Sequence, residues 1–261
     1  MALDFSPFFQ QYEALAREID AVFAKVQAKH AGCVSCGEGC DDCCYALFDL
    51  SLIEAMYLNY HFHRKYSGME RDAILDRADE ADRESYKIKK KIFKASQSGG
   101  STADILAEVA RTKVRCPLLN AESRCDLYDH RPITCRVYGI PTAFGGESRT
   151  CGKSGFVKGE AYPTVNVEAI QDRLMQLSLD LVSSIATRHK ELHTVLVPVS
   201  MALLTNYDHD YLGLVGGSNC SNCGHSWTIG GDSLEPITPA GAGCRSCPSA
   251  AGCAAEVGEQ E

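Results

Sequence analysis

The residues of this 261-residue chain whose type and spacing could do chemistry are its 14 cysteines. They form three groups, from Cys33 to Cys44, from Cys116 to Cys151 and from Cys220 to Cys253. Thiolates two or three residues apart can converge on one metal, because a tight turn brings their side chains to the same side. We therefore expect the first two groups to supply metal ligands from their nine cysteines: Cys33, Cys36, Cys40, Cys43, Cys44, Cys116, Cys125, Cys135 and Cys151.

Two features of these groups bear on how a centre would be built. Cys43 and Cys44 are adjacent, and neighbouring side chains tend to diverge. One of these two cysteines can then be a metal ligand, while the other is a packing residue, a ligand of a second centre or a redox partner. Arg131 and Arg136 flank Cys135, so we expect both to lie close to the cofactor, where they could offset its charge or dock an anion.

The order of these residues resembles a known family. The run Cys36-x3-Cys40-x2-Cys43-Cys44 is followed by Cys116-Pro-Leu, and then by Cys125-x-Leu-Tyr-x2-Arg-Pro-x2-Cys135-Arg. Together these elements resemble the YkgJ-type cysteine-cluster family, described as a zinc- or iron-chelating domain with a CxxCxxCC signature. The resemblance covers roughly Cys33 to Cys151. It departs from the signature between Cys36 and Cys40, where three residues stand instead of two, and Cys33 could take over a ligand role.

The ligand type alone does not decide which metal is bound, because zinc and a [4Fe–4S] cluster both accept four thiolates. His130 lies within these groups but not at a tight-turn spacing from any cysteine, which disfavours a mixed Cys/His zinc site. Cys116 is followed by proline, as in one ligand run of bacterial ferredoxins. The similar cysteine domain of the flagellin lysine methylases also implies an iron–sulfur cluster. We expect [4Fe–4S] here, with zinc as the alternative.

The third group has the spacing of a zinc ribbon. Cys220-x2-Cys223 is separated by 20 residues from Cys244-x2-Cys247. The segment between them fits a short hairpin with Gly230-Gly231 at its turn. We expect four-thiolate zinc in an interaction or docking module, although the fifth cysteine, Cys253, keeps a [4Fe–4S] interpretation open.

The remaining sequence predicts mainly α structure, with a loop-rich cysteine metal-binding core and a small C-terminal zinc-ribbon-like β module. A capping-box pattern at Ser51 and Glu54 marks one helix start, and strand signals are weak outside residues 162–167. The expected domains are 1–215 for the helical cysteine-cluster domain and 216–253 for the ribbon-like module, with a disordered tail at 254–261. Helices are expected from Ser6 to about Val26, from Ser51, from Glu70 to about Ala95, from Thr102 to Lys113, from Val167 to Lys190, and after Pro198.

Composition narrows the classes of function. The net charge of -8 argues against a nucleic-acid partner. No apolar run is long enough for a membrane helix, and the N-terminus lacks the features of a signal peptide. We expect a cytoplasmic protein, where clustered cysteines hold metal more often than disulfides. His189 and His193, four residues apart on a predicted helix, are expected to be solvated, as is the lysine-rich run from Lys87 to Lys94.

The expected function is a metal-binding protein that holds a [4Fe–4S] cluster and acts with a protein partner, in electron transfer or a redox step of a larger assembly. One alternative is a zinc-stabilised structural or interaction protein without redox chemistry. Another, implied only by the resemblance to flagellin lysine methylases, is an S-adenosylmethionine-dependent protein methylase. The sequence shows no nucleotide-binding or nucleophile motif, so it assigns no catalytic residue.

Overall fold

The computed structural model describes residues 3–37, 39–99, 101 and 112–215, together with the backbone of two short strands at 228–229 and 232–233. Its helices in this part of the chain are α1 (Ser6–Lys29), α2 (Leu52–Lys65), α3 (Gly68–Gln97), α5 (Ile133–Val137), α6 (Val167–Ser183) and α7 (Val199–Leu204). Three single 3₁₀ turns, η1 (Asp42–Tyr45), η2 (Tyr128–His130) and η3 (Leu192–Thr194), lie between them. The predicted mainly α fold is confirmed.

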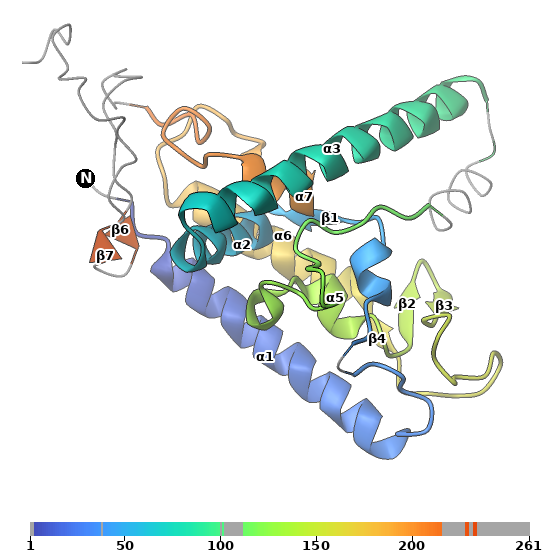
Figure 1. Ribbon diagram of the computed structural model, residues 1–261. Helices are drawn as coiled ribbons and strands as arrows, with labels where there is room; N and C mark the ends of the chain where they lie inside the picture. The colour runs from blue at the N-terminus through green and yellow to red at the C-terminus, as the bar shows by residue number, and fades with distance from the viewer. Residues whose placement is uncertain are drawn as a thin grey trace, which may run out of the picture.

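Helix α1 begins at Ser6 as the sequence predicts, with Pro7 in its first turn. Its apolar face buries Phe9, Tyr12, Leu15 and Ile19 at helical spacing. In Figure 1, α1 runs along the lower side of the molecule and α3 along the upper side, with α2 and α6 between them. The buried face of α1 therefore points into the core.

Helix α2 is buried from Leu52 to Leu58, and again at Phe62. Its predicted capping box is confirmed, because the Glu54 carboxylate accepts hydrogen bonds from the Ser51 N–H at 3.2 Å and from the Ser51 hydroxyl at 2.9 Å. The next N–H groups need acceptors too, and that of Ile53 donates to the Ser178 hydroxyl on α6 at 3.2 Å. The start of α2 is thus tied to α6 inside the core.

Helix α3 contacts the body through side chains between Ile74 and Ser85, and through Lys89, whose ammonium lies 2.7 Å from the Asp49 carboxylate. Ile74, Ala78, Ala81 and Ser85 are buried, and the helix continues to Gln97 beyond them (Figure 1). The predicted span and the break at Ser98 and Gly99 agree with this helix. The predicted helix over 102–113 falls almost wholly outside the described residues.

The described strands are short. β1 (Asp49–Ser51) pairs antiparallel with β5 (Leu196–Pro198), while β2 (Thr142–Phe144) pairs antiparallel with β3 (Glu147–Arg149) and parallel with β4 (Val165–Asn166). Only β4 falls where strand signals are visible in the sequence. In the C-terminal segment, β6 (Thr228–Ile229) pairs antiparallel with β7 (Asp232–Ser233), and the two strands flank Gly230 and Gly231 as predicted.

Helix α6 is shorter than predicted. It begins at Val167, where the Asn166 side chain accepts the Ala169 N–H at 3.1 Å, but it ends at Ser183 and not near Lys190. Beyond it, Thr187 pairs with Leu214, and its hydroxyl donates to the Leu212 carbonyl. Hydroxyl side chains compete with helical hydrogen bonds, and here a distant segment supplies the alternative partner. The prediction that His189 and His193 lie on one helix was therefore wrong.

Across the described residues, every helix is too short or too polar to cross a membrane.

Candidate metal centre

Five of the predicted ligands surround one cavity. Cys43 and Cys44 come from η1, Cys116 and Cys125 from a loop, and Cys135 from α5. The cavity has a volume of about 50 Å³, several times the roughly 10–15 Å³ that one water needs. Most of its other lining is apolar, with Arg115 and Arg131 as the charged members, and no carboxylate or imidazole among the described residues lines it. We call this group the five-thiol cavity.

Backbone hydrogen bonds hold η1 against the segment that carries Cys116. The Cys116 N–H donates to the Cys44 carbonyl at 2.7 Å, and the Val114 N–H donates to the Tyr45 carbonyl at 3.2 Å. Ala46 and Lys113 form a β-bridge next to them. Two segments about seventy residues apart in sequence are thereby aligned like strands, and their cysteines face the same space.

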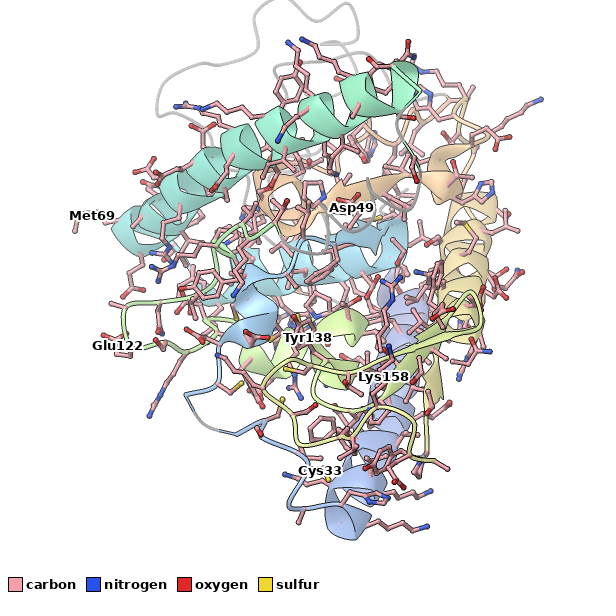
Figure 2. All side chains as sticks on the ribbon, turned by 90° about the vertical axis from the view of Figure 1, so that its right-hand side faces the viewer. Cys33, Asp49, Met69, Glu122, Tyr138 and Lys158 are labelled. Atoms are coloured by element: carbon pink, nitrogen blue, oxygen red, sulfur yellow. The ribbon has the colours of Figure 1, made fainter. Side chains whose placement is uncertain are left out.

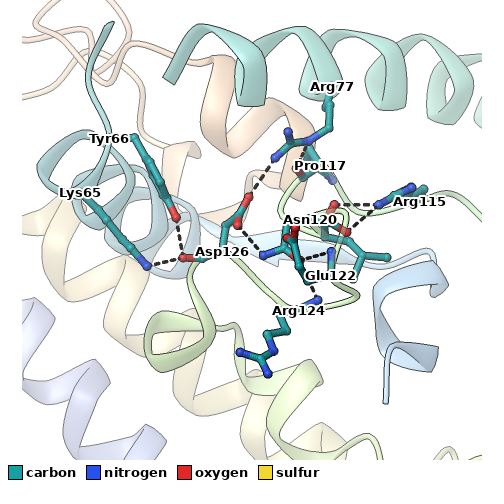
Figure 3. A network of polar contacts seen from close by, with 10 residues as sticks. Lys65, Tyr66, Arg77, Arg115, Pro117, Asn120, Glu122, Arg124 and Asp126 are labelled. Atoms are coloured by element: carbon teal, nitrogen blue, oxygen red, sulfur yellow. Dashed lines mark hydrogen bonds and ion pairs between the residues drawn. The ribbon is translucent and has the colours of Figure 1, made fainter. Parts of the chain in front are cut away.

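The loop from Cys116 to Asp126 is shaped by its own side chains (Figure 3). Leu119 and Cys125 form a β-bridge, so the loop closes on itself and brings Cys125 back towards Cys116. Within the loop, the Asn120 side-chain oxygen accepts the N–H groups of Glu122 at 3.1 Å and Arg124 at 2.9 Å. Asparagine commonly stabilises turns in this way.

Asp126 and Arg77 fasten this loop to the helices. The Arg77 guanidinium on α3 donates to the Asp126 carboxylate and to the Pro117 carbonyl, both at 2.9 Å. On the other side, Lys65 and Tyr66 donate to the Asp126 carbonyl at 2.6 and 3.0 Å (Figure 3). The position of Cys116 and Cys125 therefore depends on residues outside the cysteine pattern.

Helix α5 places Cys135 and is anchored at its first residue by the buried Glu54. The carboxylate that caps α2 also accepts the Ile133 N–H at 3.1 Å, so one side chain serves two helix starts. Burial raises the pKa of Glu54, and the hydrogen bonds from Ile133 and Ser51 act in the opposite direction.

The two predicted cofactor-binding arginines have different surroundings. Arg131 lines the cavity, and its guanidinium lies 4.1 Å from the centre of the Tyr128 ring. Arg136 is buried beside the cavity but does not line it. Its guanidinium binds Asp20 of α1 at 2.5 Å and donates to the carbonyls of Asp129 at 2.7 Å and Arg131 at 3.0 Å. Arg136 thus fastens α5 to α1.

The thiols of the cavity interact electrostatically. Hydrogen bonds from the thiols of Cys135 and Cys44 lower the pKa of Cys43, with a further contribution from Arg131. The same hydrogen bonds raise the pKa of Cys135 and of Cys44, since each donates its proton to Cys43. Of these three thiols, Cys43 is therefore the one that loses its proton most readily.

The pKa values of Cys116 and Cys125 are raised for another reason. Burial is the main cause that raises the pKa of Cys116 to about 12 and that of Cys125 to about 11, and the other thiols of the cavity add to it. A site with several such thiols becomes fully ionised only when a cation replaces their protons.

The other predicted ligands in the described part of the chain lie outside the cavity. Cys36, Cys40 and Cys151 belong to two loops that lie together, and Cys33 lies near the end of α1 (Figure 2). All nine described cysteines are free thiols. Within the described ranges, no three His, Cys, Asp or Glu side chains are grouped as tightly as the ligands of a single bound ion. Cys220, Cys223, Cys244, Cys247 and Cys253 lie outside the described residues.

His130 has partners of its own. Its Nδ1 is 3.0 Å from the Tyr57 hydroxyl, and its ring stacks on that of His61 with the centroids 3.5 Å apart. It does not line the five-thiol cavity. The donor set there consists of thiols alone, which fits a four-thiolate zinc ion or a [4Fe–4S] cluster.

Comparison with known proteins supports this assignment for part of the chain. Residues 33–152 match the family model CxxCxxCC, described as "Putative zinc- or iron-chelating domain". This match confirms the predicted resemblance to the cysteine-cluster family and supports metal binding by this segment. Comparison with curated proteins and with solved structures gave no match.

The sequence pattern left out the side chains that hold the centre in place. Glu54 is visible in the sequence as part of a capping box, but its second role at Ile133 is not. Asp20, Arg77 and Asp126 carry no signal of their own, because their partners are far away in the chain.

Proposed function

We propose that the segment 33–152 holds a [4Fe–4S] cluster in the five-thiol cavity, and that this cytoplasmic protein passes electrons to a protein partner within a larger assembly. The observation that carries the proposal is the lining of the cavity, which has five thiols and no carboxylate or imidazole among the described residues. Iron–sulfur clusters are held by four cysteine thiolates, so the cavity offers one thiol more than a cluster needs.

The residues around the thiols suit such a group. A bound [4Fe–4S] cluster supplies one-electron oxidation and reduction. The apolar side chains of Leu118, Val199 and Ala46 limit the access of water to the cavity. Arg131 brings a positive charge to the lining, and hydrogen bonds and charges near the sulfurs are the means by which a protein sets a cluster's potential.

The proposal is tested by anaerobic purification of the full chain, with iron, sulfide and zinc counted per chain. We expect about four iron and about four sulfide per chain, a brown colour, and an EPR signal after reduction that is absent before it. Colourless protein with zinc and neither iron nor sulfide would contradict the proposal.

That contrary result would support the second candidate, a zinc-stabilised structural protein. One observation favours it. Cys43 is hydrogen-bonded to both Cys135 and Cys44, which brings these sulfurs closer together than the cysteine sulfurs that hold a [4Fe–4S] cluster at its separate iron atoms. Four thiolates of this cavity would then hold one zinc ion and fasten η1, the Cys116 loop and α5 together.

A further inference from the structure

The charge of α3 changes sign along the helix. Residues 70–84 carry seven acidic and three basic side chains, whereas residues 85–97 carry five lysines and no acid. The lysine half begins where the buried side chains of the helix end, at Ser85 (Figure 1). Ion pairs within a helix join residues only three or four positions apart. Most of these charges therefore cannot be neutralised within α3 itself.

One side of α3 is turned away from the body. The buried residues Ile74, Ala78, Ala81 and Ser85 recur at intervals of three and four and mark the inner side. We call the opposite side the outer face, and its charged residues are Asp72, Asp76, Asp79, Arg83, Lys87, Lys90 and Lys94. All of these are exposed except Asp79, which is partly buried. The outer face therefore carries both signs of charge, separated along the helix.

The charges of the outer face are symmetric about Arg83. Each acid has a lysine at the same distance on the other side: Asp79 and Lys87 at four residues, Asp76 and Lys90 at seven, Asp72 and Lys94 at eleven. If two copies of α3 lie antiparallel around a two-fold axis at Arg83, every acid is level with a lysine of the second copy. A two-fold axis repeats each contact, so three pairs become six. A parallel arrangement would instead place like charges together.

Two other residues of the outer face fit the same arrangement. Arg83 would meet its own copy at the axis, but it already forms an ion pair with Asp79 of the same helix, which offsets the repulsion. Met69, at the start of α3, is 88% exposed and points away from the body (Figure 2). In the antiparallel pair it lies within one turn of Lys94 of the second copy. The aliphatic part of a lysine side chain covers apolar surface of this kind.

A partner of a single charge does not match the whole outer face. An acidic protein or a nucleic acid would attract the lysine half but be repelled by Asp72, Asp76 and Asp79. A matching partner carries both signs in the reverse order, and a second copy of this chain does so. The net charge of -8 opposes association of two copies elsewhere on their surfaces, which favours this one contact.

We propose that this chain forms a symmetric homodimer through the outer face of α3, with the two helices antiparallel and with their register set by the acid–lysine pairs. Lys90 is positioned for such a pair, because its ammonium nitrogen lies 5.8 Å from the centre of the Tyr86 ring on the same helix. The pairs from position 72 to position 94 span about 33 Å of helix.

The dimer leaves the five-thiol cavity unchanged. Ala81 and Ser85 line that cavity from the inner side of α3, and the second copy binds to the opposite side. Loss of the dimer should therefore not alter the metal content of the chain. This separates the dimer proposal from the proposed function, since either can fail without the other.

The test is sedimentation of the full chain over a range of concentrations, with a reductant that keeps the cysteines as thiols. Salt is held at about 0.1 M, where a screening length of about 10 Å weakens distant repulsion more than contacting pairs. We expect wild type to dimerise. Lys90→Glu and Asp76→Lys each turn two attractive pairs into repulsive ones, so each should raise the Kd of the dimer about tenfold or more. Lys25→Glu, the same charge change on the exposed side of α1, should leave Kd unchanged.

Mixing the two variants provides the sharper measurement. When Lys90→Glu is combined with an equal amount of Asp76→Lys, positions 76 and 90 of the two chains again carry opposite charges in both contacts. We expect the mixture to dimerise with the affinity of wild type, one copy of each variant per dimer. Recovery in the mixture also shows that both variants are folded.

Four results would overturn the proposal. Wild type that stays monomeric over the whole range forms no dimer, and variants with the wild-type Kd place the interface elsewhere. A mixture that stays monomeric shows that positions 76 and 90 do not meet. Monomeric wild type that binds polyglutamate, with binding lost in Lys90→Glu, would assign the lysine half to an acidic partner instead. Iron, sulfide and zinc counted in the same samples should be equal in wild type and all variants.

Discussion

Glu54 offers the sharpest test of how the centre is held, because one buried carboxylate accepts hydrogen bonds at the starts of both α2 and α5. Glu54→Ala removes the acceptor for the N–H groups of Ser51 and Ile133 and for the Ser51 hydroxyl. The hydroxyl can turn to another partner, so we count only the two N–H groups. A buried N–H without an acceptor costs about 1–3 kcal/mol. Taking about 1.5 kcal/mol for each of the two groups, from the lower part of that range, gives a loss of about 3 kcal/mol in the free energy of unfolding.

The assay is thermal unfolding of the full chain followed by circular dichroism. In a domain of about 150–250 residues, each kcal/mol shifts Tm by about 2–4 °C, so we expect Tm to fall by about 6–12 °C. Because Glu54 also anchors the helix that carries Cys135, the variant should release its metal to a chelator faster than wild type. Glu54→Gln keeps one acceptor and should lose about half as much stability.

The matched control is Glu70→Ala, which removes an exposed carboxylate from the first turn of α3. Exposed substitutions of this kind change stability by about 0.5 kcal/mol or less. A Tm of Glu54→Ala within about 2 °C of wild type would refute the reasoning, because it would mean that both N–H groups find other acceptors.

Three further outcomes are expected. Cys135→Ser should lose the metal of the five-thiol cavity and keep any bound by the C-terminal cysteines; unchanged metal content would refute the ligand assignment. Arg77→Met removes both 2.9 Å hydrogen bonds that tie the Cys116 loop to α3. We expect it to lower Tm by a few degrees and to speed metal release, whereas a substitution at the exposed Arg83 should do neither. Burial, with His130 and Arg64 nearby, lowers the pKa of His61 to about 3. As the pH falls below 6.5, His61 therefore binds a proton in the unfolded chain before it does so in the folded chain. The part of the folding stability that depends on a neutral His61 is complete above pH 6.5 and is lost as the pH falls towards 3. Since His61 is partly exposed, we expect wild type to lose about 1 kcal/mol more than His61→Gln between pH 7.5 and pH 5; equal losses would show that the ring is solvated.

Features set by short stretches of chain could be predicted from sequence. The start of α1 follows from apolar spacing and Pro7, and the start of α2 from Ser51 and Glu54, because these signals act within a few residues. The end of α6 could not be predicted in the same way. The apolar pattern continues past Ser183, but Thr187 instead pairs with Leu214, and such a partner is invisible to local patterns.

The same distinction holds for the site. By itself the sequence determined which residues are candidate ligands, since the spacing of the cysteines is a local property. Only the tertiary structure decided how they are grouped. The hydrogen bond from Cys116 to Cys44 helps to assemble the five-thiol cavity, and the one from Gly155 to Cys33 joins the loop after α1 to the loop that carries Cys151. The two arginines that flank Cys135 both pair with Asp20, but only Arg131 also lines the cavity. The grouping of the cysteines and the positions of the arginines depend on contacts between segments far apart in the chain. Such contacts cannot be predicted from the pattern of any single short segment.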